Sequence, residues 1–93
     1  MKLQIGDPVY LLYENKTILC DYVKFLGAES FILDQNFQPE CQFDSYEWFY
    51  KDKDIKWSTD LDTMLEILEN KNPGKDIEHV IGQGWEEYSV MEG

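Results

Sequence analysis

The chain has 93 residues, 43% of them hydrophobic and 15% aromatic, which is enough for one small core but not for two domains. Nineteen acids oppose eight lysines, arginine is absent, and the formal net charge is −11. This charge disfavours direct binding of DNA or RNA, and no stretch is apolar for long enough to cross a membrane or to act as a signal peptide. We therefore expect one cytoplasmic domain that contacts neither nucleic acid nor membrane.

The acidity is concentrated in the second part of the chain. Residues 1–33 contain four acids and three lysines, whereas residues 34–93 contain 15 acids and five lysines, so the net charges are −1 and −10. Such acidity serves solubility in many small proteins, and it also suits a surface that competes with nucleic acid for a basic partner. On charge alone, solubility is the favoured interpretation.

The N-terminal part predicts strands. A turn signal at residues 6–8 precedes a β-branched and aromatic run at 9–13, and a longer strand is predicted at 17–25. One face of the longer strand carries Leu19, Asp21, Val23 and Phe25, and the other carries Ile18, Cys20, Tyr22 and Lys24. Because both faces are apolar near its start and more polar later, we expect a bent strand that serves two sides of a curled sheet.

Further short strands are predicted at 31–34, 41–43, 46–51 and 54–57, with a polar loop at 35–40. Frequent turn signals and the absence of βαβ spacing indicate a closed or partly closed antiparallel sheet.

The spacing of the apolar residues changes from a strand period to a helical period after residue 57. Leucine and methionine then recur at helical spacing, and carboxylates recur on another side of the same helix. The apolar stripe consists of Leu61, Met64, Leu65 and Leu68, and the acidic side consists of Asp62, Glu66 and Glu69. Ser58 or Thr59 is the expected N-cap, and residues 72–74 end the helix.

Residues 76–93 form an acidic C-terminal segment after a single domain at 1–75. Apolar patches at 77–81 and 85–90 are joined by Gly82-Gln83-Gly84, so a terminal hairpin and a partly ordered tail are both compatible with the pattern.

The sequence contains no recognisable catalytic or metal-binding motif. Its single histidine is His79, its cysteines Cys20 and Cys41 lie 21 positions apart, and neither a zinc spacing nor a Gly-x-Ser-x-Gly or P-loop pattern is present. We expect a protein that is not an enzyme and has no cofactor or metal, with both cysteines packed as thiols rather than joined in a disulfide.

Two groups of residues remain as candidate partner-binding sites. The first is an aromatic group, for which a barrel core is the favoured interpretation and a partner-binding face the alternative: Tyr46, Trp48, Tyr50 and Trp57. The second is an acidic face in which the helix carboxylates rise by about 6 and then 4.5 Å, a spacing comparable with that of phosphates on a strand. It comprises Asp62, Glu66, Glu69, Asp76, Glu78, Glu86 and Glu87, followed by Glu92.

The stretches "IGDPVYLL", "FILD" and "WFYKDKDIKWSTDLDTMLEIL" resemble a loosely related class of short phage and prophage proteins. These share a "GD-x-V-Y" opening, an SH3-like barrel and a Ser/Thr-capped helix. The chain departs from the class at residues 60–62, where Glu-Glu-Ala is common, and the resemblance does not extend to the segment from Asp76 onward. The resemblance covers roughly residues 3–70 and implies origin and architecture, and it carries over no catalytic residue.

The sequence therefore predicts a mainly β (α+β) fold: a small SH3-like, partly closed antiparallel β-barrel with one amphipathic helix and an acidic terminal segment. The leading functional hypothesis is an inhibitor or modulator of a host or phage-encoded protein with a basic surface, such as a nucleic-acid mimic of the anti-CRISPR or anti-restriction type. The alternative is an adaptor or structural module that uses the aromatic face around Trp48 and Trp57 to bind a peptide or to form a homodimer.

Overall fold

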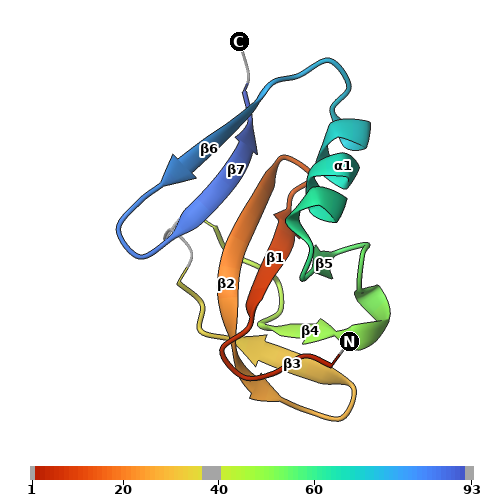
Figure 1. Ribbon diagram of the computed structural model, residues 1–93, viewed down its shortest axis with the longest axis vertical. Helices are drawn as coiled ribbons and strands as arrows, with labels where there is room; N and C mark the ends of the chain where they lie inside the picture. Colours follow the sequence, from red (N-terminus) through yellow and green to blue (C-terminus); the bar gives the residue numbers. More distant parts are fainter. Residues whose placement is uncertain (1, 37–40, 92–93) are drawn as a thin grey trace.

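The computed structural model describes residues 2–36 and 41–91, in which seven strands, one α-helix and one 3-10 helix are found. Figure 1 shows their arrangement. In chain order the elements are β1 (Pro8–Tyr13), β2 (Thr17–Leu26), β3 (Ser30–Leu33), β4 (Glu47–Phe49), η1 (Tyr50–Asp52), β5 (Trp57–Ser58), α1 (Leu61–Lys71), β6 (Ile77–Ile81) and β7 (Glu86–Val90). Seven strands and a single α-helix among the described residues agree with the predicted mainly β class.

The strands form one antiparallel sheet. Its order is β4-β3-β2-β1-β5, and β7 pairs with both β2 and β6. The first four strands follow one another as a meander, and β5 returns to pair with β1 through Tyr10↔Ser58 and Leu11↔Trp57. This return curls the sheet around the side chains on its inner face.

Strand β2 is shared by the two parts of the sheet. Its first residues, 17–20, pair with β7, whereas residues 23–26 pair with β3, with a register shift between Val23 and Phe25. Figure 1 shows β2 running along most of the molecule. A single strand of this kind must bend and bury residues on both faces, which confirms the bent strand predicted from its apolar pattern.

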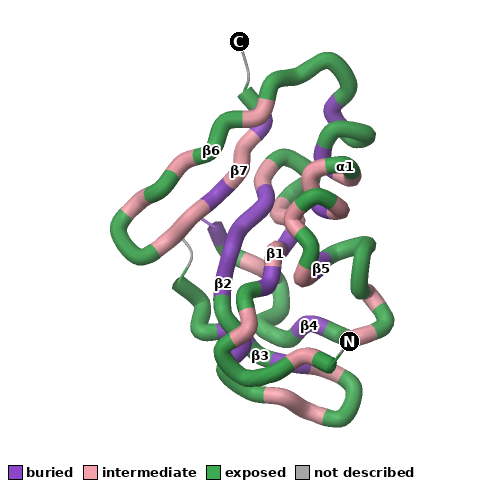
Figure 2. Tube along the Cα trace, in the orientation of Figure 1, coloured by how far each residue is buried: buried purple, intermediate pink, exposed green. Residues whose placement is uncertain are grey.

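The inner face of the curl holds the larger core cluster. Figure 2 shows buried backbone positions along β1, β2, β3 and β4. Trp57 is 2% exposed and Trp48 is 7% exposed, and the Trp57 ring meets that of Phe31 edge-on with ring centroids 4.7 Å apart. Trp48 similarly meets Phe43, which in turn meets Tyr13. The favoured interpretation of the two tryptophans as barrel core is confirmed.

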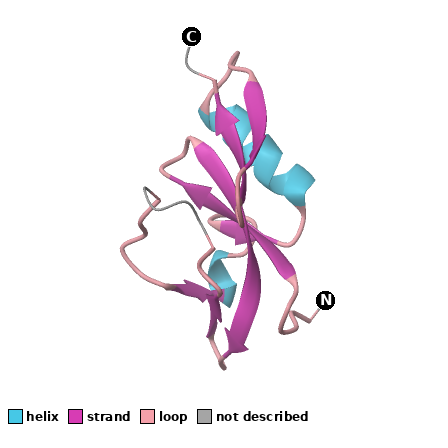
Figure 3. Cartoon of the chain, turned by 90° about the vertical axis from the view of Figure 1, so that its left-hand side faces the viewer, coloured by secondary structure: helices cyan, strands magenta, loops and turns pink. Residues whose placement is uncertain are grey.

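Helix α1 covers part of the opposite face of the sheet. Met64 and Leu68 are fully buried there with Ile18 and Val90, and Leu61 and Leu65 pack at the margin of the same cluster. Figure 3 shows α1 lying beside the strands of the upper part of the molecule. The apolar stripe predicted from the sequence is therefore the surface of α1 that packs on the sheet. No helix within the described ranges is long and apolar enough to cross a membrane.

The helix begins later than expected. Asp60 is the N-cap, because its side chain accepts hydrogen bonds from the backbone N–H of Asp62 and the hydroxyl of Thr63. Ser58 is fully buried in β5, where its hydroxyl donates to Asp54 and accepts from the backbone N–H of Asp60. Pairing with β1 thus takes Ser58 out of the capping position.

Three predicted strands are absent or shorter. Of the strand predicted at 54–57, only Trp57 lies in a strand, as the first residue of β5, because residues 54–56 form a turn. Residues 41–43 form no strand: the backbone N–H of Gln42 donates to the hydroxyl of Tyr13 instead of to a ladder partner. The predicted strand at 46–51 ends at Phe49 and continues as η1. In the predicted loop at 35–40, residues 37–40 lie outside the described residues, as does Glu92.

The C-terminal segment forms a hairpin. β6 and β7 pair from Ile77↔Val90 to Ile81↔Glu86, and β7 also pairs with the start of β2. Val90 enters the cluster beneath α1, so the hairpin is part of the same folded unit.

Candidate functional site

The outer side of α1 presents carboxylates to solvent. Asp62, Glu66 and Glu69 are all exposed, whereas Met64 and Leu68 face the sheet. Among residues 2–36 and 41–91, no lysine forms an ion pair with any of these three acids. Their charges are therefore available to a partner.

The other predicted acids do not join this side of the helix as one surface. Ile77 packs in the α1 cluster, and because side chains alternate along a strand, Glu78 faces the opposite side of the sheet. Glu87 is directly opposite Leu19 in the β2–β7 ladder and is only 8% exposed. The acidic surface predicted from the sequence is thus divided between two faces, with Asp76 exposed where the chain enters β6.

Glu86 belongs to a small polar and aromatic group on the hairpin. Its carboxylate lies 3.1 Å from Nε2 of His79, and the His79 ring stacks on Tyr88 with 4.3 Å between ring centroids. Burial and then Cys20 and Tyr88 nearby raise the pKa of Tyr10, and Glu86 contributes in the same direction. The negative charge of Glu86 therefore raises the pKa of side chains on β1, β2 and β7.

Cys20 lies in the same neighbourhood, beside a cavity of about 320 Å³ that Trp85 also lines. Burial, followed by the charges of Glu86 and Asp21, raises the pKa of the Cys20 thiol to about 11. Both cysteines are buried and no disulfide joins them. A thiol of this kind is a packing group rather than a nucleophile at neutral pH.

The predicted aromatic group does not form one exposed face. Trp48 and Trp57 are in the core, and the indole N–H of Trp57 donates to the backbone oxygen of Phe49 at 2.8 Å. Tyr46 is 54% exposed, while Tyr50 is half-buried. The two tryptophans are therefore unavailable as the centre of a flat contact surface.

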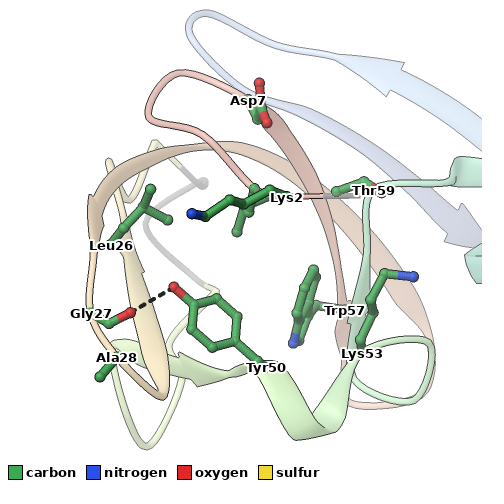
Figure 4. Close-up of a pocket in the computed structure, with 10 residues that line it drawn as sticks. Lys2, Asp7, Leu26, Gly27, Ala28, Tyr50, Lys53, Trp57 and Thr59 are labelled. Atoms are coloured by element: carbon green, nitrogen blue, oxygen red, sulfur yellow. Dashed lines mark hydrogen bonds between the residues drawn. The ribbon is translucent and has the colours of Figure 1, made fainter.

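A cavity that the sequence did not predict lies at the end of the barrel core. Its volume is about 440 Å³, within the range of small-molecule pockets. Four chain segments build it: the N-terminal residues, the β2–β3 turn, η1, and β5 with the residue after it. Figure 4 shows the side chains that line it, among them Lys2, Leu26, Tyr50, Lys53 and Trp57.

Hydrogen bonds fix the walls of this cavity. The Tyr50 hydroxyl donates to the backbone oxygen of Gly27 at 2.9 Å, and the Tyr50 backbone N–H donates to the backbone oxygen of Glu29 at 3.0 Å. Tyr50 also stacks on Phe31, with ring centroids 5.8 Å apart. These contacts hold Tyr50 in place as one wall of the cavity.

Among residues 2–36 and 41–91, no three histidine, cysteine or acidic side chains gather in an arrangement that could hold a metal ion. The chain matches no protein-family model, no curated protein and no solved structure.

Proposed function

We propose that this chain is a small acidic protein-binding module of phage or prophage origin, which inhibits or modulates a host protein by placing carboxylates on its basic, nucleic-acid-binding surface. Its fold is proposed to be SH3-like. That assignment is supported by the meander β1 to β4, the pairing of β5 with β1, and the 3-10 helix between β4 and β5.

The outer side of α1 carries the proposal. Asp62, Glu66 and Glu69 are exposed, follow one another by one turn of helix, and have no lysine partner among the described residues. They stand on a helix whose inner side is anchored by Met64 and Leu68. Fixed carboxylates of this kind can occupy a basic groove at a lower entropy cost than those of an unfolded tail.

The experiment compares two charge-reversed variants of the full chain. In the first, Asp62→Lys, Glu66→Lys and Glu69→Lys are combined; in the control, Glu29→Lys, Asp34→Lys and Asp44→Lys are combined at exposed positions outside α1. Each substitution changes the charge by two, so both variants have a net charge of −5 instead of −11. Circular dichroism establishes that each variant folds.

Each protein is immobilised and incubated with a bacterial lysate, and retained proteins are identified by mass spectrometry. Wild type and control should retain the same nucleic-acid-binding protein, and the α1 variant should lose it. The retained protein should be released by competing double-stranded DNA and by raising the salt concentration from about 0.05 to 0.5 M, since the contact is electrostatic. Retention by the α1 variant, or retention unaffected by salt and DNA, would contradict the proposal.

A further inference from the structure

The cavity at the end of the barrel core combines an apolar interior with one available positive charge. Leu3, Leu26 and Tyr50 pack against the core cluster at this end, and Trp57 belongs to that cluster. Figure 4 shows the Lys2 side chain extending across the cavity toward Leu26 and Tyr50. Two lysines, Lys2 and Lys53, and one acidic residue, Asp7, also line this mostly apolar space.

Polar groups of the cavity walls make hydrogen bonds within the protein. The Asp7 carboxylate, which also lines the cavity, accepts a hydrogen bond from the backbone N–H of Gln4 at 2.8 Å. The Tyr50 hydroxyl donates to Gly27, and the Trp57 indole N–H donates to Phe49. The ammonium group of Lys53 lies 3.1 Å from the carboxylate of Asp54, and Figure 4 shows it pointing away from the cavity. The Lys2 ammonium has no carboxylate partner in the ranges 2–36 and 41–91.

These features define the ligand by its chemistry. The apolar walls favour an aromatic or branched aliphatic body, and the single ammonium group favours one anionic group at its end. The geometry points to a binding site for a small apolar carboxylate, in which Leu26, Tyr50 and Trp57 hold the body and Lys2 pairs with the carboxylate. Either a free small molecule or the C-terminal residue of a peptide has this chemistry.

The overall charge of the protein makes the test stringent. A net charge of −11 repels anions in general, so it predicts weaker binding of a carboxylate than of a matched neutral molecule. A preference for the carboxylate must therefore come from a local positive group.

The experiment is a titration of the ¹⁵N-labelled full chain with 4-phenylbutyrate and with 4-phenylbutan-1-ol, which has the same body and no charge. We expect amide shifts confined to residues 2–3, 7, 26–28, 50–53 and 57–59, with both probes binding in about the millimolar range typical of small ligands. The carboxylate should bind about two- to fivefold more tightly than the alcohol, the range that an exposed ion pair provides.

Two variants assign that preference. Lys2→Gln should abolish it while leaving the affinity for the alcohol unchanged, whereas Lys75→Gln, an exposed lysine outside the cavity, should preserve it. The spectra report directly whether each variant is folded. The proposal is overturned if neither probe shifts the cavity amides, if the alcohol binds as well as the carboxylate, or if the preference survives in Lys2→Gln.

A second pair of probes distinguishes the two sources of the ligand. The peptide acetyl-Gly-Ser-Gly-Leu is added with a free C-terminal carboxylate and, separately, as its C-terminal amide. Tighter binding of the free carboxylate at the same amides supports the proposal with a peptide C-terminus as the source. If only 4-phenylbutyrate binds with the dependence on Lys2, the proposal holds with a small molecule as the source.

Discussion

Asp21 provides a test of how this small fold tolerates a buried charge. Its side chain has no exposure to solvent, and its two carboxylate oxygens accept hydrogen bonds from the backbone N–H groups of Tyr22, at 2.8 Å, and Asn36, at 3.1 Å. Asn36 follows β3, so the carboxylate connects the chain leaving β3 to the middle of β2. Removing it should loosen that connection.

Two opposing effects act on the pKa of Asp21. Burial raises the pKa, and the backbone N–H groups of Tyr22, Asn36 and Gln35 lower it. Burial is the larger effect, so the pKa in the folded protein lies above its usual value. The carboxylate therefore both organises the backbone around it and destabilises the folded protein by being charged.

The substitution Asp21→Asn separates these contributions. The amide keeps the size of the side chain, but its NH₂ group cannot accept a hydrogen bond, so one of the two N–H groups loses its acceptor. An unsatisfied N–H costs about 1–3 kcal/mol, and removal of a buried charge offsets part of this cost. We expect a net loss of about 1–2 kcal/mol in the free energy of unfolding at pH 7.

The pH dependence follows from the raised pKa. Between the unfolded-state pKa of about 3.9 and the folded-state pKa, the folded protein binds more protons than the unfolded chain, so wild-type stability contributed by Asp21 falls as pH rises. The asparagine variant has no such dependence, and the other carboxyl groups are common to both proteins. The cost of Asp21→Asn should therefore be greater at pH 3 than at pH 7.

Urea unfolding followed by tryptophan fluorescence measures this cost at both pH values. Asp44→Asn, at an exposed carboxylate, is the control and should change the free energy of unfolding by no more than about 0.5 kcal/mol. A cost of Asp21→Asn that increases with pH would refute the reasoning, because it would mean that the N–H groups outweigh burial. A cost of Asp21→Asn no larger than that of the control would mean that the carboxylate does not stabilise the contact between β2 and the chain that follows β3.

Two further predictions concern the packing of α1 and the thiol beneath the hairpin. Leu68 is fully buried, so Leu68→Ala should lower the free energy of unfolding, measured by urea titration, by about 2–5 kcal/mol. The control Glu66→Ala, on the exposed side of α1, should change it by about 0.5 kcal/mol or less. Equal effects of the two substitutions would contradict the packing of α1 on the sheet. The pKa of Cys20 is about 11, so the rate of its alkylation by iodoacetamide should keep rising with pH up to about 10. Peptide mass spectrometry locates the alkylated residue, and Glu86→Gln should increase the rate at pH 8, because the charge of Glu86 raises the pKa of the thiol. A rate that stops rising near pH 8.5 would contradict this prediction.

The sequence predicts the elements whose signals are local. The spacing of Met64 and Leu68 depends only on the helical period, and both residues are fully buried where that period places them. The bend in β2 was also predictable, because Ile18 and Leu19 are adjacent apolar residues on opposite faces of one strand and both are buried. Neither inference requires knowledge of which strands pair.

Features that depend on long-range pairing were not predictable in this way. Serine is a residue type favoured at helix N-caps, yet the pairing of Ser58 with Tyr10 buries Ser58, and Asp60 caps the helix instead. Glu87 appears in the sequence as part of an acidic tail, but its position opposite Leu19 in the ladder buries it. In both cases the identity of the residue is compatible with two locations, and a partner distant in sequence decides between them.

The apolar cavity is the most extreme case, because no segment of the chain contains a signal for it. The pairing of Leu11 with Trp57 brings β5 against β1, and the hydrogen bond from the Gly6 N–H to the Val23 oxygen holds the N-terminal residues beside β2. Together with the hydrogen bonds of Tyr50, these long-range contacts bring Lys2, Leu26 and Tyr50 around one cavity. Net charge is a sum over the whole chain, so it gives no information about a single ammonium group that faces an apolar space. A strongly acidic protein can for that reason carry a site for an anion, and local geometry rather than composition decides whether it does.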